Sequence, residues 1–181
     1  MQKLFMVILG CNPPNRFTEQ HDVFFGIAPA LVDLKPNLVE FWPEAGEKSH
    51  LDSYRIVQKV GKYKITIVEA DAKQNNGLHL YFLNLGGYKP HDMEEYHYKQ
   101  LIVSPSLAEA IRTGKKDTFW KHHTEPHVDN KYGIDVDDIY LVEDMLPCAL
   151  KSQFGIQIDE AFEGMEEDTL QIGYLKWSKI K

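Results

Sequence analysis

The chain has 181 residues, of which 43% are hydrophobic and 12% aromatic, so it is long enough to build one compact domain or two small ones. Its formal net charge is −7, and residues 125–168 carry 13 acidic and two basic side chains, which would repel a phosphate backbone. The longest apolar run, residues 4–9, is far shorter than the ~20 residues that a membrane span needs. We therefore expect a protein that binds neither nucleic acid nor membrane. The two cysteines, Cys11 and Cys148, lie far apart and have no metal-ligand spacing, which favours a reduced cytoplasmic compartment.

The first half of the chain predicts short strands separated by turns. Apolar runs bounded by polar residues or glycine indicate strands at 3–9, 21–27, 55–60 and 63–68. Gly61 and Lys62, between the last two strands, suit a β-hairpin. A helix is expected to begin at Pro29, because proline is tolerated in the first turn. Pro36 is expected to break or kink that helix.

The second half predicts the same order of elements. Strands are expected at 78–85, 96–103 and 133–142, with a loop at 86–93 between the first two. A helix is expected at 105–121, with Ser104 as its N-cap. Beyond Pro147, two further strands are expected at 153–158 and 170–177.

The two halves are also related in sequence. Residues 4–34 align without a gap onto residues 80–110, and eight of the 31 pairs are identical. The identical pairs are Leu4/Leu80, Leu9/Leu85, Gly10/Gly86, Pro14/Pro90, Glu19/Glu95, His21/His97, Pro29/Pro105 and Leu31/Leu107. A repeat inside one chain predicts two copies of one structural unit. The predicted fold is therefore α+β: two tandem ββαβ(β)-type repeats, at 1–70 and 78–147, packed as one pseudo-symmetric unit with a small C-terminal β extension at 148–181.

Both copies keep a glutamate two residues before a histidine. The pairs are Glu19 with His21 and Glu95 with His97. Residues two apart in a strand project from the same face, so carboxylate and imidazole are expected to be neighbours. A carboxylate beside a histidine orients the ring and suits acid–base chemistry. The same pair could equally tie a loop onto a strand, and both interpretations stay open.

A second shared pattern is a histidine two residues before an aspartate. It occurs as His50 with Asp52 and, after small gaps in the alignment, as His127 with Asp129. Two histidines with one or two carboxylates would suit zinc, iron or manganese. The alternative is that each aspartate caps a turn. No metal or other cofactor is predicted from this pattern, although His97, His127 and Asp129 would be the ligands if a metal binds.

The histidine-rich segment 122–129 favours the second copy if only one site works. In the same copy, Gly86 and Gly87 follow the first strand, and their backbone amides could face an anion with Lys89 nearby. Ordinary turn chemistry explains these glycines as well.

Several motifs together resemble the bacterial family catalogued as domain of unknown function 1543, whose members carry one or two copies of the domain. In the first copy they are Leu9-Gly10, residues 19–25, residues 41–43, His50-x-Asp52 and Gly61-x-Tyr63-x-Ile65; in the second they are residues 85–90, Glu95-x-His97 and residues 131–140. The resemblance implies a bacterial, soluble, two-copy protein. It brings no activity, substrate or catalytic residue.

No recognisable catalytic signature, such as a Walker loop or Gly-x-Ser-x-Gly, occurs in the sequence. The leading hypothesis is a non-enzymatic binding module for a small molecule or a protein partner. Its candidate binding residues are Glu19, His21, His50, Asp52, Gly86, Gly87, Lys89, Glu95, His97, His127 and Asp129. One alternative is a hydrolase-like or metal-assisted enzyme that uses the Glu-x-His and His-x-Asp residues. Another is a structural protein that forms a homodimer through exposed strand edges.

Overall fold

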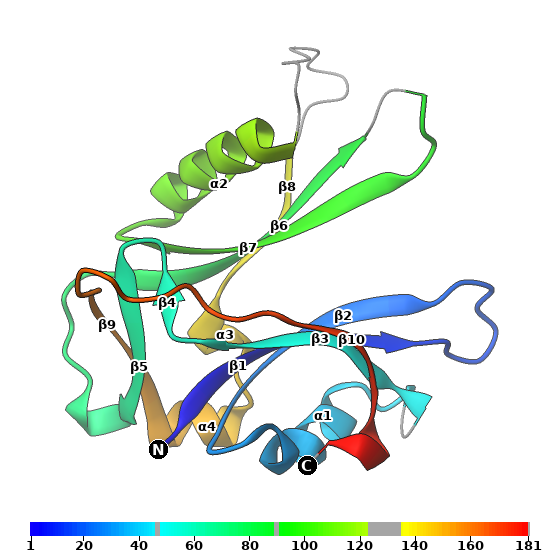
Figure 1. Cartoon of the computed structure of the whole chain (residues 1–181), viewed down its shortest axis with the longest axis horizontal. Helices are drawn as coiled ribbons and strands as arrows, with labels where there is room; N and C mark the ends of the chain where they lie inside the picture. Colours follow the sequence, from blue (N-terminus) through cyan, green and yellow to red (C-terminus); the bar gives the residue numbers. More distant parts are fainter. Residues whose placement is uncertain (46–47, 89–90, 123–134, 181) are drawn as a thin grey trace. The chain divides into compact units, whose positions relative to one another are not determined.

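The computed structural model describes residues 1–45, 48–88, 91–122 and 135–180 (Figure 1). These residues form two compact units, one made of Met1–Gln74 with Met145–Lys181 and the other of Asn75–Asp144. Both contain antiparallel strands and helices, which confirms the α+β class. The C-terminal segment belongs to the first unit. In the part of the chain that the structure describes, no helix has the length and apolar character to cross a membrane.

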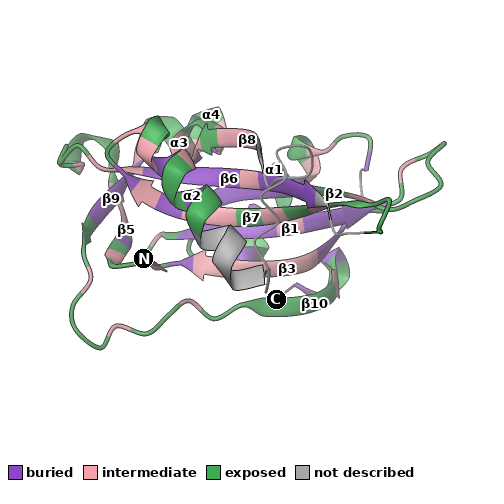
Figure 2. Ribbon diagram, turned by 90° about the horizontal axis from the view of Figure 1, so that it is seen from above, coloured by how far each residue is buried: buried purple, intermediate pink, exposed green. Residues whose placement is uncertain are grey.

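The main sheet of the first unit has four strands in the order β10-β3-β1-β2. Their bounds are β1 Lys3–Cys11, β2 Gln20–Ala28, β3 His50–Val57 and β10 Gln171–Lys176. β1 is an inner strand and is buried along most of its length (Figure 2). Because both faces of the strand are buried, its residues are nearly all apolar and do not alternate between apolar and polar. The strands predicted at 3–9, 21–27 and 170–177 are confirmed within a few residues at each end.

Two short helical segments supply the apolar cover of this sheet. They are η1 (Leu31–Leu34) and α1 (Lys35–Phe41), whose Leu31, Leu34 and Leu38 pack with Phe5 and Phe24 in one core. The prediction that Pro36 breaks or kinks a helix begun at Pro29 is wrong. It lies in the first turn of α1, where its missing N–H costs nothing, and the 3-10 turn precedes it.

A second sheet of the first unit has the order β4-β5-β9. Its strands are β4 Lys59–Val60, β5 Tyr63–Glu69 and β9 Phe154–Glu160. Gly61 has a φ of 58°, the left-handed conformation that the predicted β4–β5 hairpin needs. β9 pairs with β5 along its whole length, so the C-terminal segment completes this sheet instead of extending outward. The remaining helical segments are η3 Ala70–Ala72, α3 Val142–Met145, α4 Cys148–Gln153 and η4 Trp177–Lys179.

In the described residues of the second unit, one sheet has the order β7-β6-β8, α2 packs against it, and most of α3 follows β8. Its elements are β6 His79–Tyr88, β7 Glu95–Ser104, α2 Leu107–His122 and β8 Asp135–Leu141. The Oγ of Ser106 accepts a hydrogen bond from the Glu109 amide at 3.3 Å, so Ser106 is the N-cap and the prediction of Ser104 is wrong. Gly114 allows α2 to lie close to the sheet, because a Cβ there would be 2.5 Å from Leu83 Cδ2.

Candidate functional site

The Glu-x-His and His-x-Asp motifs of the first unit come together at one end of the main sheet. Gly10, on β1, pairs with His21 on β2 and with His50 on β3. The two histidines therefore flank the same glycine from opposite sides. His50 is the first residue of β3, whereas the sequence predicted it in a loop before that strand.

A β-bulge adds Asp52 to this group. Along β1, Ile8 pairs with Ser53 and the next residue, Leu9, pairs with Leu51, so Asp52 is the extra residue of β3. Bulges redirect side chains at the ends of sheets. Here the carboxylate of Asp52 lies over Gly10 together with the imidazole of His50.

The four side chains form a ring of close nitrogen–oxygen contacts, which we call the His–carboxylate cluster (Glu19, His21, His50 and Asp52). His50 Nε2 lies 3.1 Å from Glu19 Oε1 and 3.2 Å from Asp52 Oδ1. His21 Nε2 lies 3.2 Å from Asp52 Oδ2 and 3.5 Å from Glu19 Oε2. Each imidazole thus contacts both carboxylates. The predicted proximity of Glu19 and His21 is seen in the structure, together with the link to His50 and Asp52.

Gly10 is the residue that makes room for this cluster. A Cβ atom at position 10 would lie 2.6 Å from His50 Nε2 and 2.6 Å from Asp52 Oδ2. Real Cβ atoms do not approach other atoms so closely, so any larger residue would displace one of the two groups. The sequence analysis did not select Gly10. Its identity with Gly86 in the internal alignment was the signal that could have identified it.

The cluster has a buried side and an exposed side. The side chain of His50 is 8% exposed, that of Asp52 30%, and those of His21 and Glu19 45% each. The His50 ring also packs against Tyr174 of β10, with ring centroids 4.3 Å apart. Tyr174, which is 61% exposed, was missed because nothing in the sequence indicates that β10 lies beside β3.

The hydrogen bonding of Asp52 is incomplete. Its Oδ2 atom is buried, and although His21 Nε2 is only 3.2 Å away, no well-aligned hydrogen bond reaches it from the described residues. We regard this contact as an electrostatic interaction and not as a hydrogen bond, because a short distance with poor donor geometry contributes little hydrogen-bond energy. Among the described residues, no lysine or arginine forms an ion pair with either carboxylate of the cluster. An acceptor buried in this way favours a donor from outside the chain.

Cys11, at the end of β1, is not a reactive group of this site. Its side chain is fully buried, and its Sγ lies 4.0 Å from the carbonyl oxygen of Ala45. Burial raises the pKa of the Cys11 thiol, an effect that Lys48 opposes and Glu19 reinforces. The protonated thiol is a poor nucleophile and metal ligand.

The second unit has a different set of residues at the corresponding positions. Gly86 pairs with His97 on β7 and with Asp135 on β8, so an aspartate stands where the first sheet has His50. His97 Nε2 lies 3.9 Å from Glu95 Oε2, with the two side chains 38% and 37% exposed. The predicted residues His127, Asp129 and Lys89 lie outside the described residues. Within the described ranges, no group of three or more His, Cys, Asp or Glu side chains is arranged to hold a metal ion.

The glycine loop predicted as an anion site is a strand. Gly86 and Gly87 belong to β6, where they pair with His97 and Tyr96. Their amides are therefore part of a sheet and do not form an open loop. The prediction of an exposed amide cradle at these two residues is wrong.

Comparison with known proteins gives a family match over part of the chain and a similar fold. Residues 16–67 match the family described as Domain of Unknown Function (DUF1543), which confirms the resemblance over the segment that contains all four cluster residues. The crystal structure of a protein Il1583 from Idiomarina loihiensis is similar, with a TM-score of 0.64, 20% identity and 97% of each chain covered. At this identity the likeness shows the fold alone. No curated protein matches the sequence.

Proposed function

We propose that the chain is a non-enzymatic binding module, and that the His–carboxylate cluster of the first unit binds an ammonium or guanidinium group. That group would belong to a small molecule or to a lysine or arginine side chain of a partner protein. The observation that carries the proposal is the buried Asp52 Oδ2, which lacks a well-aligned hydrogen-bond donor among the described residues.

The charge of the cluster supports a cation. Glu19 and Asp52 contribute two negative charges when ionised, and the histidines offset them only when they carry extra protons. Because His50 and Asp52 are largely shielded from water, a cation here would be attracted more strongly than at an open surface. A guanidinium group can also donate to both oxygens of a carboxylate at once, which adds direction to the attraction.

Tyr174 supports an organic cation. Its ring packs beside His50, and the residue is 61% exposed, so the cluster has an exposed aromatic neighbour. Organic cations bind favourably over tyrosine rings through the ring quadrupole. Carboxylates together with an aromatic ring provide both the charge and the surface that an alkylammonium or alkylguanidinium needs.

The proposal is tested by titrating the full chain with methylguanidinium and with butylammonium at constant ionic strength, with backbone amide NMR signals as the readout. Saturable shifts at the ends of β1, β2 and β3 are expected. The double variant Glu19→Gln/Asp52→Asn should weaken binding at least tenfold. Glu40→Gln/Asp71→Asn changes the net charge equally at exposed sites of the same unit and should leave binding unchanged. Equal binding by both double variants would refute the proposal. A peptide containing arginine that binds much more tightly than methylguanidinium would identify a protein partner.

The alternative prediction is that the chain is a hydrolase-like or metal-assisted enzyme that uses these residues. The observation in its favour is that His50 Nε2 lies within 3.2 Å of both carboxylates, and a carboxylate beside a histidine suits acid–base chemistry. Titration with zinc sulfate tests the metal version. Stoichiometric zinc binding that abolishes methylguanidinium binding would favour it over the organic cation.

We also infer that the two units are tandem copies of one ββαβ design in a cytoplasmic protein. The support is that β1 and β6 both lie between the strand that follows them and a later strand, and that both carry a register shift one residue before the Leu-Gly pair. Homodimerisation through exposed strand edges stays a prediction, and light scattering of the full chain tests it.

A further inference from the structure

We propose that a second site in the first unit, next to the His–carboxylate cluster and in contact with it through Tyr174, binds the phosphate group of a small molecule. It is a pocket of about 490 Å³. Its lining residues are Lys35, Val39, Lys48, Ser49, Tyr174, Lys176, Trp177 and Ser178. Three of these eight residues are lysines, and none is acidic.

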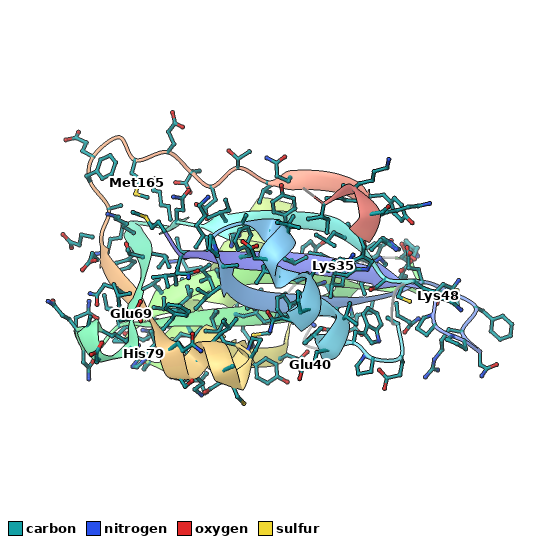
Figure 3. The ribbon with its side chains drawn as sticks, turned by 90° about the horizontal axis from the view of Figure 1, so that it is seen from below. Lys35, Glu40, Lys48, Glu69, His79 and Met165 are labelled. Carbon is teal, nitrogen blue, oxygen red and sulfur yellow. The ribbon has the colours of Figure 1, made fainter. Side chains whose placement is uncertain are left out.

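The three lysines reach the pocket from separate parts of the chain. Lys35 begins α1, Lys48 lies just before β3, and Lys176 ends β10. Figure 3 labels the first two. The fold thus brings three lysines that are distant in sequence to the lining of one pocket. Their convergence results from tertiary structure and not from a local basic run.

The second feature of these lysines is that their side chains are not in ion pairs within the described part of the chain. Among the described residues, none of the three forms an ion pair. The chain as a whole has a net charge of −7, so a pocket whose charged lining residues are all basic differs from the acidic average of the chain. Like charges that face one space repel each other, and a bound anion would relieve that repulsion. Lysine is a common phosphate ligand in proteins because its ammonium group acts as a mobile point charge with three donors.

The lining of the pocket includes a buried, hydrogen-bonded tryptophan and apolar side chains. Trp177 is 7% exposed, and its indole Nε1 donates a hydrogen bond to the buried Ser49 Oγ at 2.9 Å. Val39 and the exposed Tyr174 add apolar surface, and the hydroxyls of Tyr174 and Ser178 are further polar groups at the lining. This combination fits a phosphate joined to a carbon skeleton, with the phosphate near the lysines.

The experiment is a titration of the full chain with pyrophosphate at constant ionic strength, followed through the indole N–H signal of Trp177. The chain has three tryptophans, so this signal is readily assigned. We expect a saturable shift of Trp177, and at least tenfold weaker binding in Lys35→Gln/Lys48→Gln/Lys176→Gln. The matched control, Lys3→Gln/Lys62→Gln/Lys64→Gln, removes three exposed lysines elsewhere in the same unit and should bind like the wild type.

Three results would overturn the proposal. They are no shift of Trp177, equal weakening in both triple variants, and succinate binding as tightly as pyrophosphate. The second would indicate general charge attraction, and the third a carboxylate site. If the pocket variant unfolds, Lys48→Gln alone should still weaken binding at least threefold relative to Lys64→Gln. Glu19→Gln/Asp52→Asn should still bind pyrophosphate, so failure of the cation proposal and failure of this one can be distinguished.

Discussion

Gly10 and His50 face each other on neighbouring strands, and the absence of a side chain on Gly10 leaves the space that His50 Nε2 occupies. A methyl group at position 10 would lie 2.6 Å from that nitrogen. The His–carboxylate cluster therefore depends on a residue that contributes no functional group to it.

Gly10→Ala is expected to disrupt the cluster more than the fold. The atoms that it would displace are the ends of the His50 and Asp52 side chains, which can move without shifting the backbone. We expect a loss of about 1 kcal/mol in unfolding free energy, within the usual range for a single substitution, and loss of methylguanidinium binding. Urea denaturation and NMR titration of the same sample check both. Unchanged cation affinity would show that the space at Gly10 is irrelevant to binding.

The two histidines of the cluster are expected to differ in their effect on stability. His50→Ala removes a side chain that is only 8% exposed and packs against Tyr174, and it should cost about 2 kcal/mol. His21→Ala removes a side chain that is 45% exposed and should stay within about 0.5 kcal/mol of wild type. Urea denaturation of both variants tests this order. Equal losses would mean that burial does not distinguish their roles.

His97→Ala in the second unit should change stability by less than about 1 kcal/mol. Its contact with Glu95 is 3.9 Å long and lies on a surface where both side chains are more than one-third exposed, so the ion pair contributes little. Leu83→Ala, in the same sheet, provides the reference and should cost about 3 kcal/mol because Leu83 is fully buried. A loss at His97 comparable to that at Leu83 would assign the histidine to the framework of the unit.

Much of the fold could be predicted from the sequence because the main strands are apolar and bounded by turn residues. β1, β6 and β9 follow this rule. The strand period of two also placed Glu19 beside His21. The meeting of His21 with His50 could not be predicted, because it depends on the register of β1 with both neighbours and on the bulge at Asp52.

The second copy shows the limit of aligning short motifs. The sequence placed His127 and Asp129 opposite His50 and Asp52, whereas the strand register places Asp135 at the position of His50. Small gaps in a loop can move an alignment by several residues without changing its score much. Strand pairing has a strict period of two and resists such shifts. On β8, the position that pairs with Gly86 is therefore occupied by Asp135 and not by a second histidine.

Asp168 predicts a distinct pH dependence of stability. Its side chain is 2% exposed, and its Oδ1 accepts hydrogen bonds from the amides of Gln58 and Lys59 at 3.0 Å each. Burial raises the pKa of the Asp168 carboxyl above its ordinary value of 3.8, although the two amides and Arg55 oppose this shift. The folded state thus binds this proton more tightly than the unfolded state. The stabilising contribution is complete at low pH and is lost as the pH rises through the folded pKa.

Asp168→Asn keeps an acceptor for both amides and cannot ionise. Its unfolding free energy relative to wild type should therefore increase from pH 4 to pH 7, as measured by urea denaturation at each pH. Asp168→Ala also cannot ionise but leaves both amides without their acceptor, so it should be about 2 kcal/mol less stable than Asp168→Asn at every pH. A relative stability of Asp168→Asn that falls with pH would show that Arg55 and the amides outweigh burial.

The most direct test of cation binding by the His–carboxylate cluster is to record the imidazole nitrogen signals of His21 and His50 while methylguanidinium is added at pH 8. Binding at the cluster predicts saturable shifts of both histidines with one dissociation constant. His97 provides the internal control and should not shift. Shifts confined to His97, or no saturable shift of His50, would contradict the account.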